Sequence, residues 1–296
     1  MVPLEKNAEY LSNIKVSAVI PAKNEAAAIG NVLREIFALS VVDEVLVIDD
    51  GSTDQTAEIA RAEGARVISH PYSMGNGAAI KAGARAATGD ILVFMDGDGQ
   101  HSPKDISRLL KQLHQGLDMV VGARTAGSQA SFGRGVANRI YNRLASYMTG
   151  QKIEDLTSGF RAVKAYKFRQ FLYLLPNGFS YPTTSTMAFF RAGYKVGYIP
   201  IRAAKRVGKS HIKPLQDGVR FLLIIFKIGT LYSPLKVFVP ISFLVFFTGL
   251  SYYGYTYFTS GQFTNMSALM FTTSLVVFMV GLVSEQITAL MYRDSD

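Results

Sequence analysis

Short apolar runs alternate with longer segments of helical periodicity along the first part of the chain. Five runs rich in β-branched residues predict buried strands, at residues 16–20, 45–48, 66–69, 91–95 and 119–121. The segments between them predict helices, at residues 26–39, 53–63, 77–87 and 103–115. This alternation predicts an α/β fold in which helices flank a mostly parallel sheet.

The pattern is less regular after Gly122. Residues 131–149 and 183–191 predict two more helices, residues 196–201 predict a strand, and residues 154–161 form a loop that enters another strand. Ser102 and Pro103 suit the N-cap and the first position of the helix expected at 103–115.

The C-terminal part of the chain is strongly apolar, with no charged residue between Val237 and Ser284. Residues 235–258 and 266–290 are each long enough to cross a hydrocarbon core of ~30 Å, which takes about 20 residues. A pair of buried core helices is the alternative. Glu285 has to face a partner helix or reach the interface if the second segment spans a membrane.

The apolar run within residues 214–231 has Arg220 and Lys227 at its ends, which predicts an amphipathic helix lying in the membrane interface. We therefore expect three parts. An α/β domain occupies residues 1–213, the interfacial helix residues 214–233, and a two-helix transmembrane domain residues 234–296.

The net charge of +9 is concentrated just before the apolar segments, where residues 195–236 hold nine Lys or Arg and one Asp. Cytoplasmic loops beside membrane spans concentrate basic residues, and anionic lipids attract them. The position of the basic residues therefore favours a membrane surface as their partner and argues against nucleic acid. The N-terminus has no apolar segment typical of a signal peptide, so an integral cytoplasmic-membrane protein is expected, with both termini and the α/β domain cytoplasmic. Assembly of several copies through the transmembrane helices stays open.

Polar residues follow three of the predicted strands, at residues 21–25 (Pro-Ala-Lys-Asn-Glu), 49–54 (Asp-Asp-Gly-Ser-Thr-Asp) and 96–101 (Asp-Gly-Asp-Gly-Gln-His). Ligands of parallel sheets bind at the carboxyl ends of strands. The Asp96–Asp98 pair can hold Mg²⁺ or Mn²⁺, which prefer oxygen ligands and share them with substrate phosphates, and Gln100 adds a neutral oxygen. The chain has no cysteine, which excludes thiolate metal sites and disulfides. Separately, we expect His101 and His114 to lie at the surface.

Together these motifs are more specific than any one of them. Residues 19–25, 47–54 and 96–101 resemble the inverting family 2 glycosyltransferases of the GT-A fold. Residues 121–124 (Val-Gly-Ala-Arg), 157–162 (Thr-Ser-Gly-Phe-Arg-Ala) and 206–210 (Arg-Val-Gly-Lys-Ser) are similar to the polyprenyl-phosphate branch, the dolichyl-phosphate mannose synthase group. The resemblance covers about residues 15–230 and implies a Rossmann-like GT-A domain.

The resemblance also implies roles for individual residues, which match the family's motifs in this sequence. Those expected to frame the base and ribose or approach the nucleotide are Pro21, Glu25, Asp50 and Lys81. Those expected at the ribose or metal are Asp96, Asp98 and Gln100. Those expected to meet the acceptor phosphate are Arg124, Arg139 (with Arg134 as the other candidate in that helix), Arg206 and Lys209.

Three assignments leave alternatives open. Glu25 can simply cap the first helix, and the arginines of residues 131–149 can lie on a solvated or lipid-facing side. Asp155 is the carboxylate available as a base or orienting group, or as a loop cap. A lipid phosphate is already anionic near neutral pH, so a strong general base is not required.

The expected activity is transfer of a hexose from a nucleotide-diphosphate sugar, of the UDP-glucose or GDP-mannose type, to undecaprenyl or dolichyl phosphate. One alternative is a membrane glycosyltransferase that extends a saccharide, although the chain has no Trp for the Gln-x-x-Arg-Trp motif of processive synthases. A catalytically silent GT-A membrane scaffold is the other.

Overall fold

The computed structural model describes residues 14–125, 132–178, 180–204, 226, 229–230 and 233–293, without the side chains of 132–137 and 291–293. The chain divides into two compact units. The first comprises residues 1–143 and 151–211, and the second comprises residues 144–150 and 212–296. The second unit thus takes in residues 144–150, at the end of a long helix that begins in the first unit, as well as the C-terminal residues. The expected division into residues 1–213, 214–233 and 234–296 stays a prediction.

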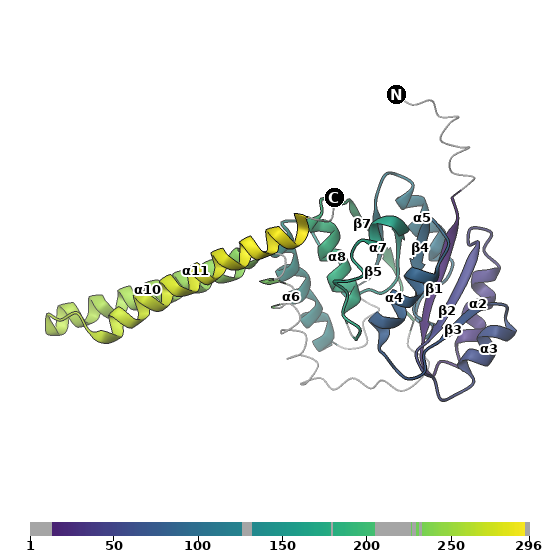
Figure 1. The fold of residues 1–296 in the computed structure, drawn as a ribbon, viewed down its shortest axis with the longest axis horizontal. Coiled ribbons are helices and arrows are strands. Elements are labelled where there is room, and N and C mark those ends of the chain that lie inside the picture. Colours follow the sequence, from purple (N-terminus) through teal and green to yellow (C-terminus); the bar gives the residue numbers. More distant parts are fainter. Residues whose placement is uncertain are drawn as a thin grey trace, which may run out of the picture. The chain divides into compact units, whose positions relative to one another are not determined.

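The first unit is built on a sheet that has seven strands within its described residues (Figure 1). Only β6 runs antiparallel to its neighbours, β4 and β5. The expected mostly parallel α/β sheet is therefore confirmed. The strand order is β3 (Arg66–Ser69), β2 (Glu44–Asp49), β1 (Val16–Ala22), β4 (Ile91–Phe94), β6 (Arg161–Lys164), β5 (Met119–Arg124) and β7 (Val196–Ile201).

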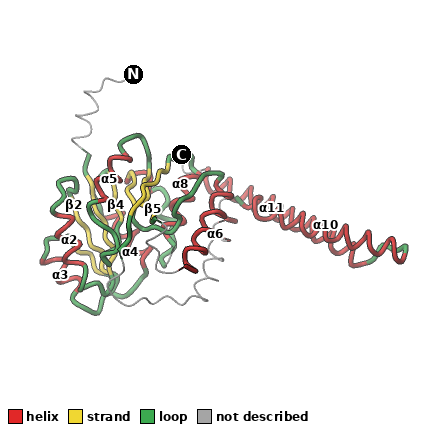
Figure 2. The backbone as a smooth tube through the Cα atoms, turned by 180° about the vertical axis from the view of Figure 1, so that it is seen from behind, coloured by secondary structure: helices red, strands yellow, loops and turns green. Residues whose placement is uncertain are grey.

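Alternate residues of β1 enter the two halves of the core, because successive side chains of a strand point to opposite faces. Ala18 and Ile20 join a cluster with apolar residues of three helices, whereas Val19 packs on Gly83 from the other face. The helices of this unit, seen from both sides in Figures 1 and 2, are α2 (Ile29–Phe37), α3 (Thr56–Ala62), α4 (Asn76–Ala86), α5 (Asp105–Leu113), α6 (Phe132–Thr149), α7 (Ala165–Arg169) and α8 (Tyr181–Arg191).

The helices expected from periodicity are present, with ends that differ by a few residues. The start of α5 is the clearest difference. The helix begins at Asp105, and Ser102 and Pro103 accept backbone hydrogen bonds in the turn before it, from Asp105 and Ile106. The predicted N-cap at Ser102 was therefore wrong, because the chain makes one extra turn before α5.

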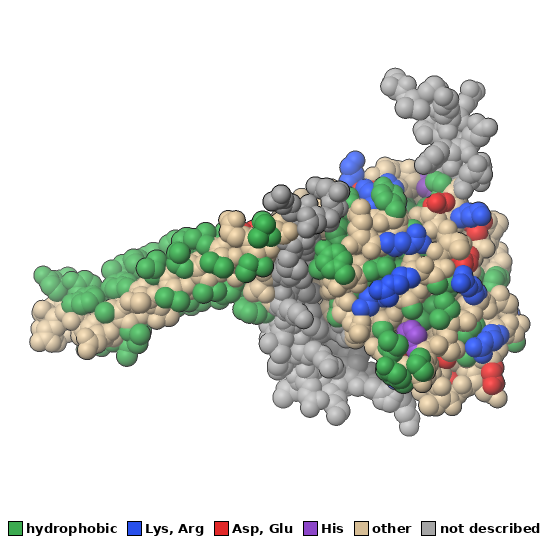
Figure 3. Space-filling model, in the orientation of Figure 1, with side chains coloured by type: hydrophobic (Ala, Val, Ile, Leu, Met, Phe, Trp, Pro, Cys, Tyr) green, Lys and Arg blue, Asp and Glu red, His purple; other side chains and the backbone are tan. Residues whose placement is uncertain are grey.

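The second unit contains a helical hairpin formed by α10 (Pro234–Ser260) and α11 (Asn265–Arg293). Both helices are long and apolar enough to cross a membrane. In the most apolar 18-residue stretch of each helix, only 11% and 17% of the residues are buried. The two helices therefore differ from the core helices of a globular domain, which are mostly buried. Figure 3 shows hydrophobic side chains along the visible face of the hairpin.

Small and hydroxyl residues spaced seven apart form the seam of the hairpin. On α10 the buried positions include Ser242, Gly249 and Thr256, and on α11 they include Ser267, Ser274, Gly281 and Thr288. Ser242 and Ser274 exchange hydrogen bonds between each hydroxyl and the other's carbonyl, at 2.9 and 3.1 Å. Small residues allow close approach of helices in a membrane, where apolar burial provides no driving force.

Glu285 reaches the N-terminal turn of α10, where its carboxylate accepts a hydrogen bond from the Leu235 backbone at 3.4 Å. A carboxylate is favourable at a helix N-terminus, which accounts for an acidic residue in an apolar helix. Near the same end of α10, Lys236 donates to the carbonyls of Tyr147 and Met148 at the end of α6. The interfacial helix predicted within residues 214–233 lies largely outside the described residues.

Candidate active site

Three polar loops follow the carboxyl ends of β2, β1 and β4, which are adjacent strands. The strand register pairs Ala22 with Asp49 and Val19 with Phe94, so these ends lie at the same edge of the sheet. Strand β5 also runs parallel to β4, because both are antiparallel to β6 between them. The predicted residues of the motifs 21–25, 49–54, 96–101 and 121–124 therefore share one edge.

Asp50 organises the loop that follows β3. Its carboxylate, 4% exposed, accepts hydrogen bonds from the Ser73 hydroxyl and the Met74 and Gly75 backbone at 2.8–2.9 Å, and contacts His70 Nδ1 at 2.8 Å. Burial raises the pKa of the Asp50 carboxyl, but these hydrogen bonds outweigh it and leave the pKa below its ordinary value. Each carboxylate oxygen thus has two partners within the protein. Asp50 therefore holds this loop in place, and its expected role at the base stays a prediction.

The loop after β1 is fixed to the loop after β2. Asn24 has a positive φ of 54°, and its side-chain oxygen accepts from the Thr53 backbone at 2.8 Å. Pro21 lies within β1 itself. Glu25 is buried, and its carbonyl accepts from the backbone of Ala28 and Ile29 in the turn that leads into α2, whose N-cap is Ala28.

Lys81 lies on α4 and holds a chain segment in place. Its ammonium donates to the carbonyl of Leu175 at 3.1 Å and to the side-chain oxygen of Asn177. Burial, with a smaller effect of Arg85, lowers the pKa of Lys81. Lys81 thus has a structural partner, and its predicted approach to a nucleotide stays a prediction.

The Asp96–Asp98 pair lies directly after β4. Asp98 is 7% exposed and accepts a hydrogen bond from the Gln100 backbone at 3.0 Å, and Asp96 is half-buried. Within the described part of the chain, no group of three His, Cys, Asp or Glu residues could hold a metal ion. Two carboxylates and an amide oxygen suit an ion that completes its coordination with water and substrate phosphates, as Mg²⁺ and Mn²⁺ do. The residues present therefore fit such an ion.

His101 is buried and stacks on Phe160 of the segment before β6, with ring centroids 5.2 Å apart. Burial lowers the pKa of His101. The predicted surface position was therefore wrong for His101, whereas His114 is exposed as predicted.

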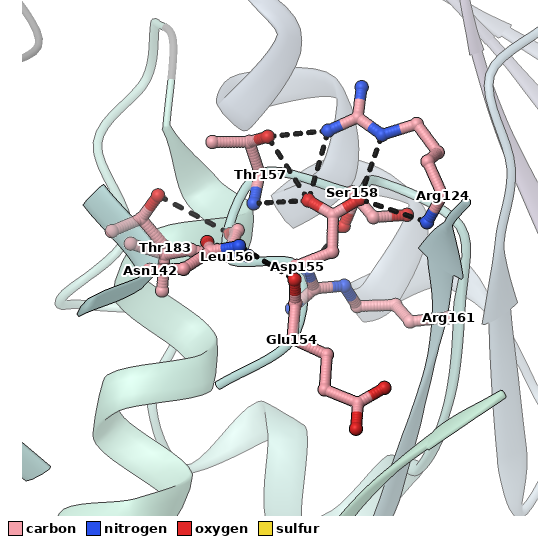
Figure 4. A network of polar contacts seen from close by, with 9 residues as sticks. All are labelled: Arg124, Asn142, Glu154, Asp155, Leu156, Thr157, Ser158, Arg161 and Thr183. Carbon is pink, nitrogen blue, oxygen red and sulfur yellow. Dashed lines mark hydrogen bonds and ion pairs between the residues drawn. The ribbon is translucent and has the colours of Figure 1, made fainter. Parts of the chain in front are cut away.

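Arg124, the last residue of β5, forms a bidentate ion pair with Asp155 (Figure 4). Arg124 Nε and Nη2 donate to the two carboxylate oxygens at 2.8 and 2.9 Å, and Nη2 also donates to the Thr157 hydroxyl at 2.5 Å. Asp155 accepts from the backbone N–H groups of Arg124 and Thr157 as well. Asp155 thus both caps its loop and orients the arginine.

Among the described residues, the hydrogen bonds of this guanidinium use Nε and Nη2 and leave Nη1 unpaired. The Arg124 side chain is 26% exposed, and its Nη1 has no hydrogen-bond partner within the described residues. Burial raises the pKa of the Asp155 carboxyl, but Arg124 outweighs this effect and holds the pKa below its ordinary value. A carboxylate that is already ionised and paired in this way orients Arg124 and is poorly suited to accept a proton.

Of the other residues expected at the acceptor phosphate, Arg139 is exposed on α6. It lies three residues before Asn142, and residues three apart share a helix face. The Asn142 amide donates to Glu154 O and accepts from Leu156 N, on either side of Asp155. Arg139 therefore lies on the helix face that contacts the Asp155 loop. Arg206 and Lys209 lie outside the described residues, as does the side chain of Arg134.

The structure also shows a pocket lined by Asp96 and by residues to which the sequence gave no individual role. Thr157 and Gly159 line it on one side, and residues 180–183 at the start of α8 line it on another. Arg161 is fully buried behind these segments and donates to the carbonyls of Ser158 and Pro182. The motif at residues 157–162 was the only sequence signal for this region.

This sheet, with carboxylates and an oriented arginine at one edge, is the arrangement of a nucleotide-sugar transferase of the GT-A type. The model of Glycosyl transferase family 2 matches residues 17–172, and the chain belongs to this family. The model of the GtrB C-terminal hairpin matches residues 233–290, which include most of α10 and α11.

Two relatives and one solved structure show how far the similarity extends. Glycosyltransferase AglJ of Haloferax volcanii is 29% identical over 291 residues, which cover 93% of this chain and 94% of the relative. A dolichyl-phosphate hexose transferase of the same organism is 30% identical over 205 residues, 69% of this chain and 89% of the relative. Glucosyl-3-phosphoglycerate synthase of Mycobacterium tuberculosis, solved with Mn²⁺, UDP and glucosyl-3-phosphoglycerate, has a TM-score of 0.59 at 25% identity, covering 75% of this chain and 84% of that one.

Proposed function

We propose that this glycosyltransferase moves a hexosyl group from a nucleoside-diphosphate sugar to the phosphate of a polyprenyl lipid. The observation that carries the proposal is the Arg124–Asp155 pair, which presents a guanidinium at the same sheet edge as Asp96 and Asp98. The apolar hairpin of the same chain and the similarity to a dolichyl-phosphate hexose transferase support a lipid acceptor.

On the donor side, the base and ribose lie against Pro21, Glu25 and the loop held by Asp50. The diphosphate lies at Asp96 and Asp98, with Gln100 as a further ligand of the metal. A bound Mg²⁺ or Mn²⁺ supplies neutralisation of the leaving diphosphate. The UDP and Mn²⁺ bound by the similar synthase support this arrangement.

On the acceptor side, Arg124 binds the lipid phosphate through Nη1, the guanidinium nitrogen that has no partner among the described residues. Arg139, Arg206 and Lys209 are further candidates for the same phosphate. A phosphate oxygen then attacks the anomeric carbon, the bond to the diphosphate breaks, and the configuration inverts. Because the attacking oxygen is already anionic, Asp155 removes no proton and acts only by orienting Arg124.

The hairpin anchors the protein in the cytoplasmic membrane, with the catalytic unit and both termini on the cytoplasmic side. The basic excess of residues 195–236 supports this orientation, since short cytoplasmic loops are rich in Lys and Arg. Assembly through the hairpins of several copies is compatible with their exposed apolar faces.

The test uses the purified chain with undecaprenyl or dolichyl phosphate and a panel of labelled UDP- and GDP-sugars, with and without Mn²⁺. At least one donor is expected to give a lipid-linked product. Asp98→Ala is expected to abolish metal-dependent transfer without lowering the melting temperature. If no donor labels the lipid fraction, the proposal fails; unchanged turnover of Asp98→Ala removes only the assigned role of Asp98.

A further inference from the structure

The pocket beside Asp96 is enclosed by two chain segments that are joined to each other. Arg161, which is 0% exposed, donates from Nη1 to Pro182 O at 3.1 Å and from Nη2 to Ser158 O. Tyr181 donates from its hydroxyl to Gly159 O at 2.9 Å. The Nη1 and Nη2 bonds of Arg161, together with the Tyr181 bond, therefore join the two walls of the pocket.

Ser180 occupies an unusual position in this pocket. It is the N-cap of α8 with φ +94° and ψ +18°, a left-handed conformation that is rare outside glycine. Its side chain makes no capping hydrogen bond. The residue is 4% exposed, and its Oγ is buried without a hydrogen-bond partner within the described residues.

Both features are costly in a folded protein. Backbone strain of this kind has to be offset by the surrounding structure, and a buried hydroxyl without a partner has lost its hydrogen bonds to water. Strained residues with unpaired polar groups cluster at ligand sites, where the ligand supplies the missing partner.

The chemistry of the lining selects a neutral, hydroxyl-rich ligand. Asp96 is the one charged side chain among the described residues that line the pocket, and its carboxylate disfavours a second anion. The other polar groups belong to Asn76, Thr157, Ser180 and Thr183, and the Tyr181 side chain adds an aromatic ring. Hydroxyls and an amide beside an aromatic ring match the alternating polar and apolar faces of a sugar.

We propose that Ser180 is a specificity-determining residue, whose hydroxyl binds a hydroxyl group of the donor's sugar in this pocket. The assignment rests on the proposed function, because it takes Asp96 to lie at the donor diphosphate, next to the glycosyl group. The hydrogen bonds of Arg161 and Tyr181 then hold the two walls at a fixed distance, so that the pocket accepts a sugar of one size.

The test measures affinities of the full chain for UDP, GDP, UDP-glucose and GDP-mannose with Mn²⁺, by calorimetry in detergent. For the donor that binds, Ser180→Ala is expected to weaken nucleotide-sugar binding by about 3- to 10-fold, the equivalent of one neutral hydrogen bond, and to change binding of the free nucleoside diphosphate by less than about 2-fold. Ser158→Ala is the matched control. Its hydroxyl is also buried and unpaired within the described residues, but Ser158 does not line the pocket.

Ser180→Gly separates binding from stability. Glycine adopts φ +94° without strain, so this variant is expected to keep or raise the melting temperature while losing sugar affinity as Ser180→Ala does. Undiminished sugar affinity in Ser180→Ala, or an equal loss in Ser158→Ala, overturns the assignment. A wild-type chain that binds none of the four nucleotides contradicts the proposed function itself.

Discussion

Replacing Asp155 by asparagine tests whether this residue positions Arg124 or acts as a base. The carboxylate accepts from Arg124 Nε and Nη2 and from the backbone of Arg124 and Thr157. An asparagine keeps one acceptor oxygen, but its NH₂ group replaces the other and cannot accept from the N–H groups of Arg124 or Thr157. Breaking a buried ion pair costs about 3–5 kcal/mol. Because the Arg124 side chain is 26% exposed and can be partly rehydrated, we expect a loss of about 2–4 kcal/mol in the free energy of unfolding at pH 7.

The sign of the pH dependence follows from the lowered pKa of Asp155. A carboxyl whose pKa is lower in the folded state stabilises the fold above its unfolded pKa of about 3.9, and this contribution is lost as the pH falls toward the folded pKa. The stability gap between the wild type and Asp155→Asn is therefore expected to be constant from pH 5 to pH 8 and to narrow below about pH 4. Denaturant titrations at a series of pH values measure it.

The kinetic effect follows from the same geometry. Misplacing Arg124 removes charge-assisted hydrogen bonds worth about 1.5–3 kcal/mol, which lowers kcat/KM for the lipid phosphate by about 10- to 150-fold. Arg124→Ala and the double variant are expected to show nearly the same loss, because the two residues act as one unit. Above pH 5 the pH profile of Asp155→Asn keeps its wild-type shape.

Glu154→Gln is the neighbouring control, since the Glu154–Lys152 pair is exposed and contributes at most about 1 kcal/mol. Additive losses in Arg124→Ala and Asp155→Asn, or an acidic limb of kcat/KM that vanishes in Asp155→Asn, would refute the positioning role and favour a base.

Two further predictions concern the fold. A Cβ at Gly83 would lie 2.2 Å from Val19 Cγ1. Overpacking costs about 1–3 kcal/mol and the better helix propensity of alanine returns about 1 kcal/mol, so Gly83→Ala should lower the free energy of unfolding by up to about 2 kcal/mol. A urea titration that shows stabilisation contradicts this packing. Asp118 pairs with Lys164 at 2.8 Å and Lys167 at 2.9 Å, which outweigh burial and lower its pKa. Asp118→Asn should therefore be less stable at pH 7 by about 1–2 kcal/mol, and the deficit should disappear as the pH falls below about 4; melting curves at pH 7 and pH 3 check both statements.

The sequence was sufficient to predict the sheet and the edge that carries the site. Strands and helices differ in hydrophobic period, and parallel strands end at a common edge, so the positions of Asp50 and Asp96 followed from local patterns. Arg124 was singled out only by the resemblance of residues 121–124 to a family motif. The two apolar helices followed from length and the absence of charge.

The partners of these side chains could not be predicted in the same way. Arg124 and Asp155 lie 31 residues apart, and their pairing depends on how the loop before β6 returns to the end of β5. The burial of His101 depends on Phe160 in the same way, and the strain at Ser180 depends on the packing of α8. Sequence patterns report backbone periodicity, whereas these contacts depend on tertiary packing.

The most direct test of the central claim follows two labels from one donor, ¹⁴C in the sugar and ³²P in the β-phosphate. Attack of a lipid phosphate oxygen on the anomeric carbon moves ¹⁴C into the lipid fraction and leaves ³²P in water as the nucleoside diphosphate. We expect that separation, dependent on Arg124 and on added polyprenyl phosphate. Transfer of both labels to the lipid, or transfer of ¹⁴C to a saccharide without any lipid phosphate, would contradict the account.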